Sequence, residues 1–236
     1  MRLFLVALLL LAAPALADEA PPRTLAVNGE GRAKAAPDLA VIAFAVETTA
    51  PTAGAAVADN AKKSTALADA IKKKLGPKDK VYTTQYSLAP QYEQRDRAAG
   101  NLAAAPRIVG YVAANAVRVE LHAVNDVGGV IDAATAAGAN RVDQLEFTLE
   151  AQESAQTDAL KLAGADAKRQ AEAAAAALGV TLGKVLSAST GSPPIVMPKA
   201  YSRVAMAAMD VGSLPTPVEA GDVTVSATLQ VTYEIQ

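Results

Sequence analysis

The closing stretch of the chain, from Asp222 to Gln236, alternates without a break between apolar and polar side chains. Period-two alternation is typical of a β-strand with one face on a core and the other toward water. We therefore predict a long strand in an antiparallel or mixed sheet, beside other long strands such as Ile108–Leu121, with its apolar face against helices. Its apolar positions are Val223, Val225, Ala227, Leu229, Val231, Tyr233 and Ile235.

Earlier stretches predict further strands from alternating or continuous apolar positions. They are Thr24–Glu30, Leu39–Thr48, Lys80–Tyr92, Ile108–Leu121, Arg141–Glu150 and Lys184–Thr190. Tyr82, Tyr86 and Tyr92 fall in one of these strands and Tyr111 in the next. We expect these tyrosines to belong to a core whose hydroxyls reach its rim; a face that binds a sugar or a peptide is the alternative. Gly110 predicts a bulge or a close backbone approach.

Two stretches between these strands have the apolar spacing of amphipathic helices. The first follows Thr52, a predicted N-cap, and ends at Gly76-Pro77. Asn60 lies on its apolar face, and we expect a buried amide bonded to a neighbouring strand or loop rather than a ligand contact. The second helix has Asn125 as its predicted N-cap and ends at Gly138.

A third helix is predicted from Ser154 to Gly179, with an apolar stripe made almost entirely of alanines. Because small side chains allow close packing, we expect it to lie near a sheet or another helix. The stripe is Leu160, Ala163, Ala167, Ala171, Ala174 and Leu178. These elements predict the α+β class: mixed, largely antiparallel sheets of long strands packed against Ala-rich helices, with βαβ-type repeats, in one domain over residues 24–236.

The N-terminus predicts export. Met1-Arg2 is a short positive segment, Leu3–Ala13 is apolar, and Ala15–Ala17 forms a small-residue cleavage site. The apolar run is shorter than the ~20 residues that span a bilayer, so we predict a signal peptide over residues 1–17 that is cleaved after Ala17. Residues 18–23 form a polar linker. The predicted location is the periplasm.

Composition narrows the candidate chemistry. The formal net charge of −2 and the absence of a basic domain argue against a nucleic-acid partner. There is no cysteine, which excludes disulfides, thiol catalysis and a lipid anchor, and one histidine cannot build a multi-His metal site.

Motifs of hydrolases such as G-x-S-x-G and H-E-x-x-H are absent. We predict no catalytic residue, no cofactor and no metal site, and a surface or capping role for His122. Asn28–Gly31 lacks the Lys-Ser/Thr of a phosphate loop, and we interpret it as a turn or strand end.

The stretch from Gly191 to Gly221 departs from the regular pattern. It contains five prolines, and a loop of this length in a compact domain is often functional. Met197, Met206 and Met209 lie in it, together with Tyr201. Methionine makes adaptable apolar contacts, so we predict an interaction loop formed by these four residues that packs on a neighbouring subunit or domain. Soft metal ligation by the methionines is the alternative.

Several short sequence motifs, taken together in their order and spacing, resemble the SIMPL domain (DUF541) family of bacterial envelope proteins. They are Val27–Gly31 followed by Pro37-Asp38, Thr83–Tyr92, Ile108–Tyr111, Gly138–Asn140, Asp166–Lys168 and Pro215–Pro217. The resemblance implies an exported, mostly periplasmic α+β protein that is sometimes associated with the outer membrane. It also implies oligomeric assembly and a link to envelope or oxidative stress. It defines no catalytic residues.

Two functional hypotheses follow from these observations. The first is a non-enzymatic envelope protein that assembles with copies of itself, because the chain has long alternating strands and no catalytic constellation. The second is a periplasmic module that binds a peptide, a sugar or a metal through the tyrosine face or the methionine loop.

Overall fold

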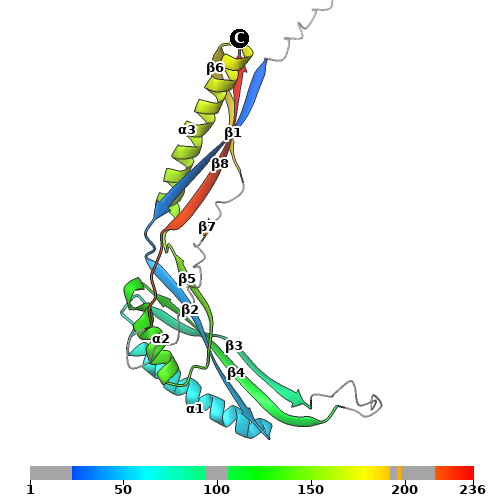
Figure 1. The fold of residues 1–236 in the computed structure, drawn as a ribbon, viewed down its shortest axis with the longest axis vertical. Coiled ribbons are helices and arrows are strands. Elements are labelled where there is room, and N and C mark those ends of the chain that lie inside the picture. The colour runs from blue at the N-terminus through cyan, green and yellow to red at the C-terminus, as the bar shows by residue number, and fades with distance from the viewer. Residues whose placement is uncertain (1–22, 94–105, 192–195, 198–215) are drawn as a thin grey trace, which may run out of the picture.

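The structure is a computed structural model that describes residues 23–93, 106–191, 196–197 and 216–236. The predicted signal peptide, its cleavage after Ala17 and residues 18–22 of the predicted linker lie outside these ranges. The described chain forms two sheets that follow one another along an elongated, bent molecule (Figure 1). The first and last described residues lie together at one end, where Thr24 pairs with Glu234.

Sheet A contains β1 (Thr24–Ala35), β8 (Val223–Ile235) and β6 (Leu182–Thr190), in the order β1-β8-β6. The short strand β7 (Val196–Met197) also pairs with β8. Helix α3 (Glu153–Leu178) lies along β1 and β8 (Figure 1). The closing strand therefore lies beside β1 and β6. Our expectation that it lies beside Ile108–Leu121 is wrong, because that strand belongs to the other sheet.

Sheet B contains β3 (Lys80–Tyr92), β4 (Ile108–Leu121), β2 (Leu39–Ala50) and β5 (Arg141–Thr148), in the order β3-β4-β2-β5. Helices α1 (Ala53–Lys72) and α2 (Val127–Ala136) follow β2 and β4, with a 3₁₀ turn at Val124–Asp126 before α2. Each helix connects two strands that are parallel with one antiparallel strand between them. This is the interleaved split βαβ arrangement of ferredoxin-like sheets.

The predicted α+β class is confirmed, and every strand pair among the described residues is antiparallel. In chain order, the whole of sheet B lies between β1 and α3 of sheet A.

Large aliphatic and aromatic side chains fill the space between sheet B and its helices. Ile42 and Phe44 of β2 and Leu67 and Ile71 of α1 are fully buried. Thr52 caps α1 as predicted, since its hydroxyl accepts from the backbone N–H of Ala55 at 3.3 Å. Asn125 does not cap α2: it lies within the 3₁₀ turn, and α2 begins without a side-chain cap.

Asn60 is a fully buried amide, as predicted. Its Nδ2 donates to the backbone oxygens of Val46 at 2.8 Å and Ala113 at 2.9 Å, and its Oδ1 accepts from Ser64 at 3.2 Å. The amide thereby joins α1 to β2 and β4. A buried polar group with partners on both strands fixes the position of the helix on the sheet.

Sheet A packs against α3 by close backbone approach. A Cβ atom at Gly31 would overlap the backbone oxygen of Ala159, and one at Gly29 would lie 2.6 Å from the backbone nitrogen of Ala167. Because β1 extends from Thr24 to Ala35, both glycines lie in its interior, and our interpretation of Asn28–Gly31 as a turn or strand end is wrong. Only glycine leaves room for the helix at these points.

The helix residues that face sheet A match the predicted stripe at Ala163, Ala167 and Ala171 and differ from it toward both ends of the helix. The buried ones are Ala155, Ala159, Ala163, Ala167, Ala171 and Ala175. The predicted end residues Leu160 and Leu178 are 36% and 64% exposed. Because α-helices have 3.6 residues per turn, a strict step of four advances each contact around the helix. The line of contacts therefore winds slowly around α3, and twisted strands can follow it. The three-and-four spacing used for the prediction describes a line of contacts parallel to the helix axis.

Two polar side chains of α3 also bind the backbone of β1. The Oδ2 of Asp166 accepts from the N–H of Glu30 at 3.0 Å, and Nε2 of Gln170 donates to the oxygen of Asn28 at 3.0 Å. The backbone hydrogen bond from Glu30 is the largest of the interactions that lower the pKa of Asp166. These bonds pair backbone groups on a strand whose only strand neighbour within the described residues is β8.

Candidate functional site

The predicted interaction loop is largely outside the described residues. Met197 lies in β7, where its backbone pairs with Thr224 of β8. Tyr201, Met206 and Met209 are not among the described residues. The role of this loop therefore remains a prediction, and the candidate surfaces below come from other parts of the chain.

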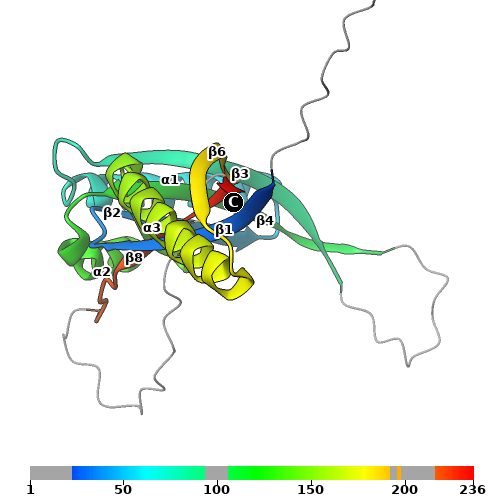
Figure 2. The same ribbon diagram turned by 90° about the horizontal axis from the view of Figure 1, so that it is seen from above.

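The outer part of the β3–β4 hairpin, which we call the arm (residues 85–92 and 108–114), projects away from sheet B (Figures 1 and 2). The third strand, β2, ends at Ala50, opposite Tyr111, so the tip of the arm has only two strands. Its apolar side chains are exposed: Tyr86 52%, Leu88 42%, Tyr92 51%, Ile108 45% and Val109 53%.

The expectation that the tyrosines form a core is wrong for Tyr86 and Tyr92 of the arm, whereas Tyr111 is partly buried and packs against a small cluster of buried alanines. Tyr82, nearer the base of β3, is also 41% exposed, and its hydroxyl donates to Glu120 at 2.8 Å. The prediction failed because a β-bulge between Thr83 and Gln85 breaks the alternation, so Tyr82 and Tyr86 point to opposite faces of the sheet, and because β3 lies at the edge of that sheet. Gly110 does meet its prediction: its Cβ would lie 3.2 Å from the oxygen of Ala50, and a β-bulge follows between Gln91 and Tyr92.

The side of sheet B opposite the helices, which we call the open face, has a floor of small side chains. Ile42 and Phe44 point to the helices, so Ala45 and its register partner Ala116 point the other way. A hollow of about 150 Å³ lies over this floor, lined by Ala45, Gln85, Ser87, Ala114, Ala116, Arg141 and Asp143. A second, wider hollow of about 360 Å³ lies beside Glu47, Thr49, Asn140 and Arg141.

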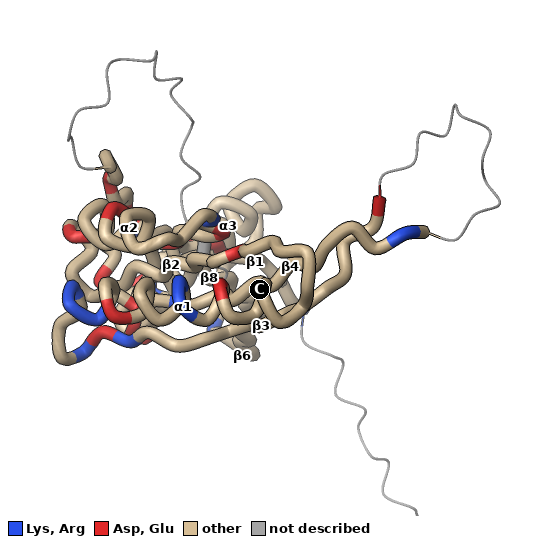
Figure 3. The backbone as a smooth tube through the Cα atoms, turned by 90° about the horizontal axis from the view of Figure 1, so that it is seen from below, with Lys and Arg blue, Asp and Glu red and all other residues tan. Residues whose placement is uncertain are grey.

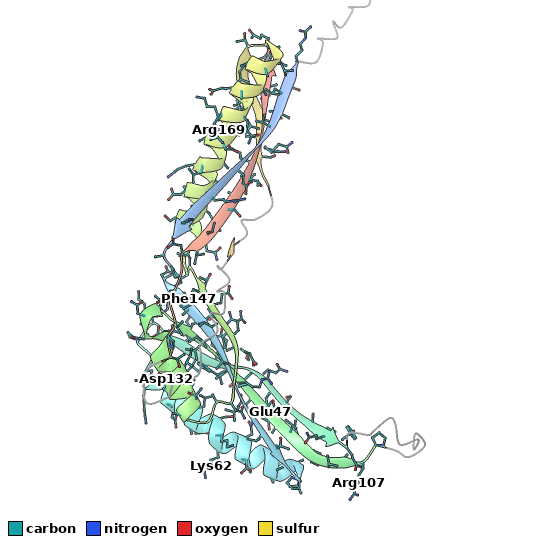
Figure 4. The ribbon with its side chains drawn as sticks, in the orientation of Figure 1. Glu47, Lys62, Arg107, Asp132, Phe147 and Arg169 are labelled. Atoms are coloured by element: carbon teal, nitrogen blue, oxygen red, sulfur yellow. The ribbon has the colours of Figure 1, made fainter. Side chains whose placement is uncertain are left out.

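Asn140 and Arg141 shape the boundary between these hollows. The Asn140 side chain accepts from the N–H of Glu47 at 2.9 Å and donates to the oxygen of Glu47 at 2.7 Å, and so continues the pairing of β2 beyond the start of β5. Arg141 donates to Asp143 at 2.8 Å and lies 3.3 Å from Glu47, which Figure 4 labels on β2. Hydrogen bonds to Asp143 and then Glu47 raise the pKa of Arg141. Its charge is thus already balanced by two carboxylates.

His122 lies between two carboxylates near the connection from sheet B to sheet A. Its Nδ1 is 2.9 Å from Oδ1 of Asp79, and its Nε2 is 3.3 Å from Oε2 of Glu150, which follows β5. The backbone N–H of His122 also donates to Asp79 at 2.8 Å. The hydrogen bond to Asp79 and the nearby carboxylate of Glu150 raise the pKa of His122, although Nε2 itself has no hydrogen-bond partner among the described residues. Burial alone would raise the pKa of Asp79, but hydrogen bonds from His122 and Gly76 outweigh it and lower the pKa.

This arrangement favours an ion pair over acid–base catalysis. A histidine that activates a nucleophile needs one ring nitrogen free to accept its proton. Here both ring nitrogens face carboxylates. The expected capping or surface role of His122 did not include these partners, because Asp79 lies forty-three residues away in the chain. No group of three or more His, Cys, Asp or Glu residues in the described part of the chain is placed to hold a metal ion.

Comparisons with known proteins agree with the resemblance found in the sequence. The family model SIMPL, described as "Protein of unknown function (DUF541)", matches residues 25–233. The chain is 32% identical to a "26 kDa periplasmic immunogenic protein" of Brucella melitensis, over 94% of this chain and 90% of that protein. The match to the protein of the same name from Brucella abortus has the same identity and coverage.

A more distant relative is the "Uncharacterized protein YggE" of Edwardsiella ictaluri, 28% identical over 68% of this chain and 64% of that protein. Among the helices of the described residues, none is long and apolar enough to cross a membrane.

Proposed function

The chain belongs to the SIMPL family of proteins of unknown function, and on this premise we propose that it is a periplasmic protein that assembles with copies of itself and has no enzymatic activity. The periplasmic location is supported by the names of the two Brucella relatives and by the signal-peptide pattern of residues 1–17. The observation that carries self-assembly is the exposed apolar arm.

The arm has the features of an interaction surface. Contiguous exposed apolar side chains on a soluble protein typically mark a contact with another molecule. Both faces of β3 are open to solvent along nearly its whole length, and in the described part of the chain β4 is its one strand neighbour. An edge strand of this kind, without a covering element, favours association with another chain.

The open face is a complementary surface for the arm. Its floor of alanines leaves room for a large side chain, and its hollow has polar groups at Gln85, Ser87 and Asp143 that can accept or donate to a tyrosine hydroxyl. We infer that the arm of one copy docks on the open face of the next. The hollow includes Gln85 and Ser87 of the arm, but Tyr86 and Leu88 point to the opposite face of the same strand. The contact therefore still joins two different surfaces, and it produces a ring or an extended filament rather than a simple two-fold dimer.

The absence of enzymatic activity is inferred from the site chemistry. The histidine is engaged by two carboxylates, and Arg141 is engaged by two others. Within the described part of the chain, both side chains therefore already lie beside opposite charges. This proposal is tested by activity screening of the purified protein against hydrolase substrates, where a signal abolished by His122→Gln or Arg141→Gln would contradict it.

Self-assembly is tested by light scattering coupled to size-exclusion chromatography on the protein purified from the periplasm. We expect a mass of several chains at micromolar concentration for the native protein and a single-chain mass for the double variant Tyr86→Ser, Leu88→Ser. A matched control, Leu160→Ser with Leu178→Ser, removes two exposed leucines from α3 and should remain assembled. A native protein that is strictly monomeric, or an arm variant that stays assembled, would overturn the proposal.

A second candidate function, a module that binds a peptide or a sugar, is supported by the polar groups that converge on the hollow of the open face. Binding should raise the melting temperature of the native protein and not that of a Ser87→Leu variant, which fills the hollow. A panel of peptides, sugars and copper with no stabilising member would count against this function.

The family resemblance also leads us to propose a role in envelope or oxidative stress. A strain that lacks the protein should be more sensitive to peroxide and to detergent than its parent, and complementation with the native gene should restore growth. Equal growth of the two strains under both stresses would contradict this part of the proposal.

A further inference from the structure

Positive charge is concentrated in one short part of the chain. Seven of the twelve lysines lie between Lys62 and Lys80, together with two aspartates, Asp69 and Asp79. The stretch from Lys62 to Lys80 therefore carries a formal charge of +5, while the whole chain carries −2. The remainder must carry −7. So uneven a distribution creates a local positive potential on an otherwise acidic molecule.

The lysines of this stretch are exposed and mostly unpaired. All seven are exposed side chains, and within the described residues only Lys80 has an ion-pair partner, Glu120 at 3.5 Å. We call the other six the lysine cluster: Lys62, Lys63, Lys72, Lys73, Lys74 and Lys78. Three lysines of α3 and β6 differ, since Lys161, Lys168 and Lys184 each have a carboxylate within 4 Å, whereas Lys34 of β1 has no ion-pair partner among the described residues.

Helix stability explains only part of the cluster. Cations in the last turn of a helix interact favourably with its dipole, which accounts for Lys72 and its immediate neighbours. Lys62 and Lys63 lie in the middle of α1, and Lys78 follows the turn after it. Their charges have no comparable structural role, and like charges at this density repel one another. A partner that supplies negative charge would relieve that repulsion.

The cluster is spread over the outer side of the molecule. Lys62 and Lys73 are eleven residues apart, close to three helical turns, so they share one side of α1, opposite the buried Asn60 and Leu67. Figure 4 labels Lys62 beside α1, and Figure 3 shows the blue segments along α1 and at its end. Neither hollow described above is lined by these lysines. A row of long, mobile cations without a pocket suits an extended charged surface better than a small anion.

We propose that the lysine cluster docks the protein on the anionic phospholipid surface of a bilayer, with the outer side of α1 toward the headgroups. Lysines near an anionic membrane attract it within about a Debye length, and clusters of four to eight lysines or arginines are the usual size for such binding. The contact is peripheral, since the helix places lysines rather than apolar side chains on this side. The proposal is independent of self-assembly, which uses the arm and the open face.

The test is co-sedimentation of the protein purified from the periplasm with vesicles. We expect binding to vesicles of phosphatidylglycerol and phosphatidylcholine in equal parts, weak binding to phosphatidylcholine alone, and loss of binding as salt rises. Each lysine near the surface contributes about fivefold to the affinity for an anionic membrane. We therefore expect at least ~100-fold weaker binding from the quadruple variant Lys62→Gln, Lys73→Gln, Lys74→Gln, Lys78→Gln.

A matched control, Lys34→Gln with Lys161→Gln, Lys168→Gln and Lys184→Gln, makes the same change in net charge on sheet A and should bind like the native protein. Circular dichroism of each variant establishes that it is folded, and light scattering on the same samples reports assembly separately. Equal binding of the cluster variant, equal loss in the control, or no preference for phosphatidylglycerol would overturn the proposal. Release by millimolar inorganic phosphate at constant ionic strength would show a phosphate-ion site instead and would also overturn it.

Discussion

Sheet A and sheet B both carry helices on one face, but they use opposite means to hold them. In sheet B, large side chains such as Phe44 and Leu67 fill the layer between strands and helices. In sheet A, Gly29 and Gly31 of β1 meet alanines of α3, and backbone lies almost directly on backbone. The packing of sheet B depends on large buried side chains, whereas the packing of sheet A depends on residues small enough to let the helix approach the strands.

This difference shows how a tryptophan-free chain with only three phenylalanines can still cover two sheets. Sheet B takes most of the large apolar residues into one core cluster. Sheet A replaces them with close approach, supported by the side-chain bonds from Asp166 and Gln170 to the backbone of β1. Small residues cost little side-chain entropy on packing, so a narrow contact can suffice.

The largest expected effect comes from removing volume in sheet B. Phe44 is fully buried, so Phe44→Ala should cost about 3–5 kcal/mol of the free energy of unfolding. The corresponding change in sheet A, Ala167→Gly, should cost only about 1 kcal/mol, mainly through helix propensity. Urea denaturation of the two variants measures both. Equal costs would mean that the two layers depend on buried volume to the same extent.

The reverse change should harm sheet A. Gly31→Ala adds a methyl group where the backbone of α3 lies, and that backbone cannot move as a side chain can. We expect a loss of about 3 kcal/mol, the upper part of the range for overpacking. Gly54→Ala is the control, because nothing lies within 4 Å of its added Cβ, and it should be neutral or slightly stabilising. If both alanine variants unfold at the native urea midpoint, α3 does not pack on β1 as described.

The smallest expected effect concerns the ion pairs near the connection between the sheets. Folding raises the pKa of His122, so its interactions stabilise the fold fully below the unfolded pKa of about 6.5 and are lost as pH rises through the folded pKa. The lowered pKa of Asp79 keeps that carboxylate charged until the solution becomes strongly acidic. The native protein should therefore exceed His122→Gln in stability by more at about pH 5.5 than at about pH 8.5 in urea titrations. A difference that does not change with pH would show that His122 contributes no charge-dependent stability.

Local patterns in the sequence predicted most of the elements. The strands Lys80–Tyr92 and Ile108–Leu121 have their predicted bounds, and the ends of α1 and α3 lie within a few residues of the glycines that predicted them. Thr52 and Asn60 also have their predicted partners. These features depend on hydrogen bonds and periodicities within a few turns of the chain, which is the range that a sequence shows directly.

The candidate surfaces were predicted less well. The tyrosines were assigned to a core, although alternation cannot show whether a helix reaches that part of the strand. The sequence shows the alanines of the open face, such as Ala45 and Ala116, but it does not show that they form one surface. That follows only from the pairing of their strands. Gly29 and Gly31 were interpreted as a turn or strand end, although glycine inside a strand can also mark a close backbone approach, as it does at Gly110.

By itself, the sequence determined the α+β class, the Ala-rich helix, the family and the uneven distribution of lysine. Tertiary structure alone decided that the closing strand Val223–Ile235 pairs with Thr24–Ala35 at the opposite end of the chain, and that the whole of sheet B lies between them in sequence. The reason is physical: periodicity specifies which face of a strand is apolar, whereas its neighbours are chosen by backbone pairing and shape, which involve residues hundreds of positions apart.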